Sequence, residues 1–235
     1  LIGFLAWIAA ASVGKILSMN MTLMLRPEVW QQMYSLNALG LFFAPTDPTM
    51  VPRWAFMVLG GLVGAGAWML WLGSRPSPTP SVREYLSRMG GYLLLVGVPV
   101  QLLTGYRVWM VQPDYVREAS LQSGLFGVSW PLFVLCWVAL WVVGFNRVKW
   151  NGSVRLSGYL AALLGVVGFF FMAVARDAIR DVTLANKGYD VWKRSAEAQT
   201  DYLILVLFLL IFIAGLCVVA WLIWASWMSK PRSDY

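Results

Sequence analysis

The sequence contains no histidine, and only 12% of its residues are charged. Histidine is the commonest ligand for haem iron and the usual proton carrier near neutral pH. Its absence excludes haem held by two histidines and removes the most frequent transition-metal ligand. A soluble domain carries about 25% charged residues, so the low charge also argues against a soluble globule.

Cysteine is nearly absent as well: the sequence has two, Cys136 and Cys217, and both fall within long apolar segments. Neither belongs to a CxxC or CxxCH motif, so we expect no covalent haem, iron–sulfur cluster or zinc site from this chain. A Walker loop, a GxSxG elbow and an HExxH motif are also missing. We therefore predict that the chain alone binds no haem, metal or flavin, and that both cysteines are buried free thiols.

Apolar residues make up 60% of the chain and aromatic residues 15%. A helix needs about 20 apolar residues to cross the hydrocarbon core of a membrane. Six stretches meet this length: residues 1–25, 53–73, 87–110, 125–145, 156–176 and 202–228. The sequence thus predicts an all-α integral membrane protein, in which a single transmembrane domain over residues 1–235 forms a bundle of about six transmembrane helices with short loops.

The charged residues between these stretches predict an orientation. The loops at 74–86 and 146–155, with Arg88 and the tail after residue 228, hold eight basic and two acidic residues, whereas the opposite face holds nine of each. Unopposed positive charge in short loops favours the cytoplasmic side, so we expect a cytoplasmic C-terminus in a bacterial cytoplasmic membrane. The surplus positive charge suits lipid headgroups, and we expect no nucleic-acid partner. Because residue 1 lies in an apolar run, either an upstream segment or an uncleaved signal-like anchor is expected.

Lys15 is the one charged residue inside the first apolar stretch. An ammonium at mid-membrane costs at least about 2.5 kcal/mol, so it should face the bundle interior, a partner carboxylate or water. One interpretation makes Lys15 part of a proton or quinone site. The other pairs it with a carboxylate, or extends its long stem to the interface if the helix starts late.

Gln101 and Thr104 lie three residues apart, on one face of the stretch "GYLLLVGVPVQLLTGYRVWM". Pro99 lacks an N–H and leaves a backbone carbonyl free, which a neighbouring side chain can satisfy. These polar groups form either one wall of a ligand cleft or hydrogen bonds between helices, and the second interpretation is favoured.

The segment "GGLVGAG" at 60–66 places Gly60 and Gly64 four residues apart. Small residues at this spacing let two helices approach closely, because no Cβ holds them apart. It predicts close packing of this helix against a neighbour.

Four charged residues, Arg176, Asp177, Arg180 and Asp181, follow directly after the apolar run that ends "FFFMAVA". Helical spacing brings Asp177 within reach of Arg180 at i,i+3, so we expect the helix to continue past the bilayer with surface ion pairs. Asp181, one turn beyond Asp177, is expected to lie further into water. The alternative function is a site at the membrane boundary, where Arg176, Asp177 and Arg180 bind a quinone headgroup or an extracytoplasmic redox partner.

The block "PTDPTMVPRWAFMVLGGLVGAGAWMLWLG" (45–73), the later "VARDAIRDVTL" (174–184) and the long final apolar segment resemble subunit I of cytochrome bd-type quinol oxidases. The chain departs from that family by having no histidine and no GWxxxExGRQPW-type segment, so no haem ligand carries over. What the resemblance implies is membership of a membrane electron-transfer complex whose haems are held by another subunit or by a missing part of this one.

The expected function is therefore a haem-free membrane subunit of a bacterial respiratory or other electron-transfer complex. It would scaffold other membrane subunits and an extracytoplasmic cytochrome, and a quinone or a lipid is its expected ligand, with Lys15, Gln101, Arg176, Asp177 and Arg180 as candidate contacts. One alternative is a small transporter or channel in which Lys15 and Gln101 line the path. Another is a membrane assembly factor without a ligand.

Overall fold

The computed structural model describes residues 2–29, 35, 47–76, 78–122, 124–197 and 201–228. Within these ranges the regular elements are all α-helices, and six are long and apolar enough to cross a membrane. The chain is thus a helical integral membrane protein, as its composition predicts. The charged tail after residue 228, which entered the predicted orientation, lies outside the described residues.

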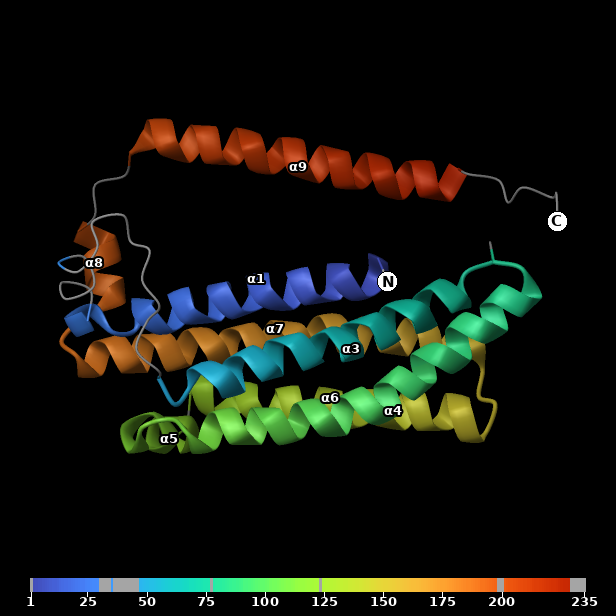
Figure 1. Cartoon of the computed structure of the whole chain (residues 1–235), viewed down its shortest axis with the longest axis horizontal. Helices are drawn as coiled ribbons and strands as arrows, with labels where there is room; N and C mark the ends of the chain where they lie inside the picture. The colour runs from blue at the N-terminus through green and yellow to red at the C-terminus, as the bar shows by residue number, and fades with distance from the viewer. Residues whose placement is uncertain are drawn as a thin grey trace. The chain divides into compact units, whose positions relative to one another are not determined.

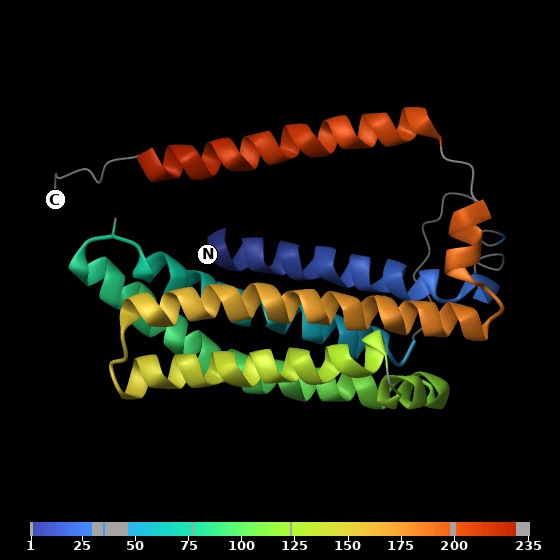
Figure 2. The same cartoon turned by 180° about the vertical axis from the view of Figure 1, so that it is seen from behind.

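Residues 1–188 form one compact unit. Its elements are α1 (Ile2–Met24), α3 (Met50–Ser74), α4 (Pro80–Met110), α5 (Asp114–Leu121), α6 (Leu125–Lys149) and α7 (Val154–Asn186). Helices α3, α4, α6 and α7 form a four-helix ring in which each packs against two others and successive helices run in opposite directions (Figure 1). Helix α1 packs against α3, and the short α5 packs against α6 and α7 at one end (Figure 2).

Residues 189–235 form a second unit, with the short α8 (Val191–Glu197) and the long α9 (Tyr202–Met228). Helix α9 is the sixth candidate span and carries no charge between residues 203 and 224. Within the described part of its own unit, Cys217 is exposed on α9, so its predicted burial in a bundle stays a prediction. Cys136 is buried in the four-helix ring, as predicted. The single domain expected over residues 1–235 stays a prediction.

The centre of the ring is filled by large side chains. Trp137 of α6 is fully buried and packs against Phe133 in a tilted arrangement with ring centroids 4.6 Å apart. It also makes an edge-to-face contact with Phe169 of α7 at 5.1 Å. Elsewhere in the ring small residues replace large ones: a Cβ on Gly90 of α4 would lie 2.8 Å from the backbone oxygen of Gly66 of α3. The close helix packing predicted from the glycine-rich segment is therefore confirmed.

Helix α7 is longer than a membrane requires. Its 33 residues extend about 50 Å, against a hydrocarbon core of about 30 Å. Ser153 caps the start of the helix, because its hydroxyl accepts a hydrogen bond from the Leu156 N–H. From Val154 the helix continues without a break through Arg176 and Asp181 to Asn186. The predicted helical extension beyond the apolar run is confirmed.

The loops of the first unit lie at two opposite ends, as the sequence predicts. The α3–α4 and α6–α7 connections share one end, whereas α5 and the ends of α1 and α7 share the other (Figure 1). We call these the loop end and the α5 end. Which end faces the cytoplasm stays a prediction.

Candidate functional site

Arg176, Asp177, Arg180 and Asp181 form a row of ion pairs along α7, called here the α7 charge row. Arg176 donates a hydrogen bond to Asp177 at 3.1 Å, and Arg180 donates to Asp181 at 3.0 Å. Arg180 also lies 3.9 Å from Asp177, the i,i+3 pair expected from helical spacing. Each guanidinium therefore has a carboxylate partner, and the row carries no net charge.

The exposure of the row runs opposite to the expected order. The side chains of Arg176 and Asp177 are 61% and 48% exposed, whereas that of Asp181 is only 26% exposed. Asp181 was expected to lie further into water. It is partly covered because α7 is still packed against the bundle at this level, where Ile179 and Thr183 are buried. The first two residues of the row are thus the more accessible ones.

Gln101 lies in the core of the ring and is 1% exposed. Its side-chain oxygen accepts a hydrogen bond of 2.8 Å from the indole N–H of Trp137, and its amide group packs against Gly60 of α3. Thr104 donates to the backbone oxygens of Val100 and Gln101 in its own helix. Of the two interpretations of this polar pair, the contacts favour hydrogen bonding between helices.

Pro99 leaves one backbone carbonyl of α4 free, as its chemistry predicts. Without an N–H at Pro99, the carbonyl of Leu95 has no partner in its own helix. The indole N–H of Trp141 on α6 donates to this carbonyl at 3.2 Å. The proline therefore creates a link between α4 and α6.

Lys15 is exposed on α1. Ala11 and Gly14 lie beside Trp54 of α3, and the Trp54 indole donates to the Ala11 carbonyl at 2.9 Å. Trp54 follows Arg53, the first charged residue of α3, so Lys15 lies about one turn from the charged end of α3. Lys15 is also near the middle of the candidate span Gly3–Met24, so its depth in a membrane stays a prediction. Its exposure is consistent with a long stem that reaches the interface.

The five candidate contacts therefore do not form one site. Arg176, Asp177 and Arg180 lie together on α7, while Gln101 is in the core and Lys15 is exposed on α1.

A charge network at the α5 end went unrecognised in the sequence. Lys187 at the end of α7 donates to both carboxylate oxygens of Glu28 at 2.9 Å and to the Leu25 carbonyl at 2.7 Å. Arg26 contacts Glu28 at 3.3 Å and Asp47 at 3.6 Å. Burial works to raise the pKa of Glu28, but the hydrogen bonds that it accepts, chiefly from Lys187, outweigh this and hold the pKa below its ordinary value of 4.5. The network ties α1 to α7.

A second unrecognised cluster lies at the loop end. Arg147, in the last turn of α6, is 3% exposed and forms an ion pair with Glu84 of α4. It also donates to the Ser87 hydroxyl at 2.9 Å and contacts the Asn151 side chain at 3.5 Å. The Arg147 Nε is buried without a hydrogen-bond partner. In the sequence analysis, Arg147 and Glu84 entered only as charges of two separate loops. The two residues are 63 positions apart, so no local sequence pattern indicates that they pair.

Across the described ranges, no group of three or more His, Cys, Asp or Glu side chains is placed to hold a metal ion. Comparisons with protein-family models, with curated proteins and with solved structures found no match to this chain.

Proposed function

We propose that this chain is a haem-free, non-catalytic membrane subunit of a bacterial electron-transfer complex, and that it holds other redox subunits in place. The observation that carries this proposal is the α7 charge row, which lies half-exposed at the end of a bundle packed with aromatic side chains. Half-exposed surface pairs contribute only about 0–1 kcal/mol each to stability. The row is therefore not needed for the fold, and its groups are available to a partner.

The chemistry of the row suits a protein partner better than a quinone. A quinone headgroup needs a cleft that excludes water, whereas Arg176 and Asp177 lie on an open helix face. Alternating guanidinium and carboxylate groups supply both donors and acceptors, so a partner with complementary charges binds without burying net charge. An extracytoplasmic cytochrome fits this description, and the resemblance of residues 45–73 and 174–184 to quinol oxidase subunit I supports the same class of complex.

A transporter or channel has less support. That alternative requires Lys15 and Gln101 on one path, but Gln101 is in the core and bonded to Trp137, and Lys15 is on the surface of α1. An assembly factor would have the same fold, and only the proteins that copurify with it would distinguish it from a subunit of the complex.

The first test is to purify the tagged chain from its native membrane in mild detergent. We expect a haem protein to copurify and to give a reduced-minus-oxidised difference spectrum, while the chain purified alone gives a flat one. A purified complex without any redox protein would contradict the proposal, and haem bound by the isolated chain would contradict its haem-free character.

The second test compares Asp177→Asn and Arg176→Gln with Arg155→Gln, an exposed arginine at the other end of α7. Hydrogen bonds to charged groups are worth about 1.5–3 kcal/mol, so we expect at least about tenfold weaker partner binding for the two row variants. The Arg155→Gln control should bind normally. Equal recovery of the partner and equal turnover in all variants would reduce the row to a membrane boundary.

A further inference from the structure

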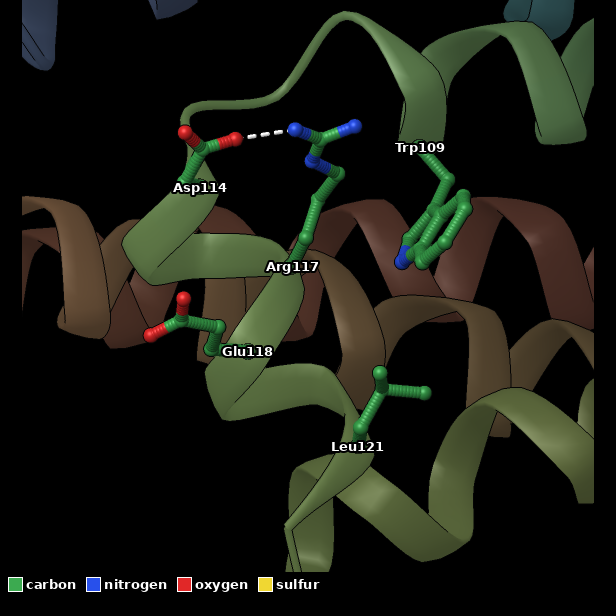
Figure 3. Close-up of a pocket in the computed structure, with 5 residues that line it drawn as sticks. All are labelled: Trp109, Asp114, Arg117, Glu118 and Leu121. Atoms are coloured by element: carbon green, nitrogen blue, oxygen red, sulfur yellow. Dashed lines mark hydrogen bonds and ion pairs between the residues drawn. The ribbon is translucent and has the colours of Figure 1, made fainter.

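A shallow pocket of about 240 Å³ lies at the connection between α4 and α6. Its lining residues are Trp109, Asp114, Arg117, Glu118 and Leu121 (Figure 3). The candidate span of α4 ends at Met110 and that of α6 begins at Leu125. The pocket therefore lies where two neighbouring spans leave the hydrocarbon core, at the depth of lipid headgroups, where Trp is enriched.

The walls of the pocket are held in place by contacts behind it. The Trp109 indole N–H donates to the Ser120 hydroxyl at 2.9 Å, and that hydroxyl donates to the Arg117 carbonyl at 2.6 Å. Val116, on the inner face of α5, is fully buried against Phe126. The short helix thus has a fixed orientation, and the pocket exists without a ligand.

The lining groups follow a definite order. Arg117 lies between Glu118 on one side and Trp109 and Leu121 on the other, and its guanidinium pairs with Asp114 (Figure 3). Glu118 forms no hydrogen bond or ion pair with any residue of the described ranges. The surface therefore runs from carboxylate through guanidinium to an aromatic and aliphatic wall.

We propose that this pocket binds the headgroup of a phospholipid that carries a primary amine, of the ethanolamine type. The ammonium lies at Glu118 and Asp114, the phosphate at Arg117, and the glycerol and first acyl carbons along Trp109 and Leu121. This is the order of groups along the lipid itself. Ammonium and carboxylate form charge-assisted hydrogen bonds, and a guanidinium matches the geometry of a phosphate.

The same groups discriminate against other headgroups. Choline has no N–H to donate to Glu118. A glycerol headgroup brings a negative phosphate without a cation to a pocket that holds two carboxylates and one guanidinium. Like charges brought together raise the cost of binding, so the anionic lipid is disfavoured.

Native mass spectrometry of the purified chain tests this assignment. Lipids with identical acyl chains and ethanolamine, choline or glycerol headgroups are titrated in turn, and the bound fraction is measured. We expect the ethanolamine lipid to bind tightest. Glu118→Gln should lower its affinity about tenfold, as expected for a lost interaction of about 1.4 kcal/mol. It should lower choline lipid binding less, because choline interacts with the carboxylate through its charge alone and has no N–H to donate.

Two further variants separate the role of Arg117 from that of Glu118. Arg117→Gln should weaken all three lipids, because each carries the phosphate, whereas Glu197→Gln, a matched change on α8 outside the pocket, should alter none. Equal binding of the three lipids, or the same ethanolamine preference in Glu118→Gln as in the parent, would overturn the proposal. Soluble phosphoethanolamine should compete poorly because it lacks acyl chains, and equal competition by it would replace the lipid with a soluble ligand.

Discussion

At the scale of single residues, two buried polar side chains of this bundle, Gln101 and Arg147, connect different helices. Gln101 of α4 is bonded to Trp137 of α6, and Arg147 of α6 is bonded to Glu84 of α4. A membrane offers no water to satisfy such groups, so each would cost several kcal/mol if left alone. Polar residues in these apolar helices therefore fix which helices are neighbours, and their presence does not by itself indicate a ligand.

The Glu28–Lys187 ion pair should make stability depend on pH in the acid range. Because the folded-state pKa of Glu28 lies below 4.5, the pair contributes fully above that value, and its contribution is lost as the pH falls through the lowered pKa. The residue is half-exposed, so we expect about 0–1 kcal/mol. Thermal unfolding in detergent from neutral to acid pH measures it.

Glu28→Gln should remove this part of the acid dependence and lower stability at neutral pH by the same amount. Glu197→Gln, which changes an exposed glutamate on α8 without a described ion pair, should leave the acid dependence as in the parent. Identical acid profiles for the parent and Glu28→Gln would show that the pair does not contribute.

At the scale of helices, α3 and α4 approach each other closely at Gly66 and Gly90. The Cβ of an alanine at position 90 would lie 2.8 Å from the Gly66 oxygen and 3.0 Å from the Leu70 nitrogen, both backbone atoms. Backbone cannot move aside as a flexible side chain can. The two helices depend on this contact, because van der Waals packing drives helix association in a membrane.

Gly90→Ala should therefore destabilise the bundle by about 1–3 kcal/mol, the usual cost of overpacking. Gly61→Ala is the matched control, since no atom lies within 4 Å of a Cβ at that position, and alanine favours helix more than glycine does. Unfolding titrations with a denaturing detergent compare the two. Equal stability of both variants would contradict the importance of this contact.

At the scale of the whole molecule, the sequence predicts the helices well and the polar contacts poorly. The six apolar stretches correspond to α1, α3, α4, α6, α7 and α9, because length and hydropathy alone define a membrane span. Three further features were also predictable: the close packing at the glycine segment, the Leu95 carbonyl that Pro99 leaves free, and the Asp177–Arg180 pair. Each depends on neighbours within one helix or on a simple geometric rule.

The missed charge contacts depend on residues that are distant in sequence. Lys187 meets Glu28, and Arg147 meets Glu84, only because α7 ends beside α1 and α6 ends beside α4. Hydropathy says nothing of these neighbours. The position of Lys15 relative to α3 also depends on how α1 packs along α3, which one apolar stretch does not show.

The predicted orientation can be tested with single cysteines in a chain whose Cys136 and Cys217 have been replaced. Thr79 and Lys149 lie at the loop end, Asn186 lies at the α5 end, and all three are exposed. If the loop end is cytoplasmic, an impermeant maleimide should label Asn186→Cys in intact spheroplasts. It should label Thr79→Cys and Lys149→Cys only after permeabilisation. The reverse pattern would keep the bundle and invert its orientation, because unopposed positive charge would then have failed to mark the cytoplasmic side. Labelling of positions 79 and 186 from the same side would contradict the antiparallel ring itself, since α4, α6 and α7 separate these two positions by three passages along the bundle.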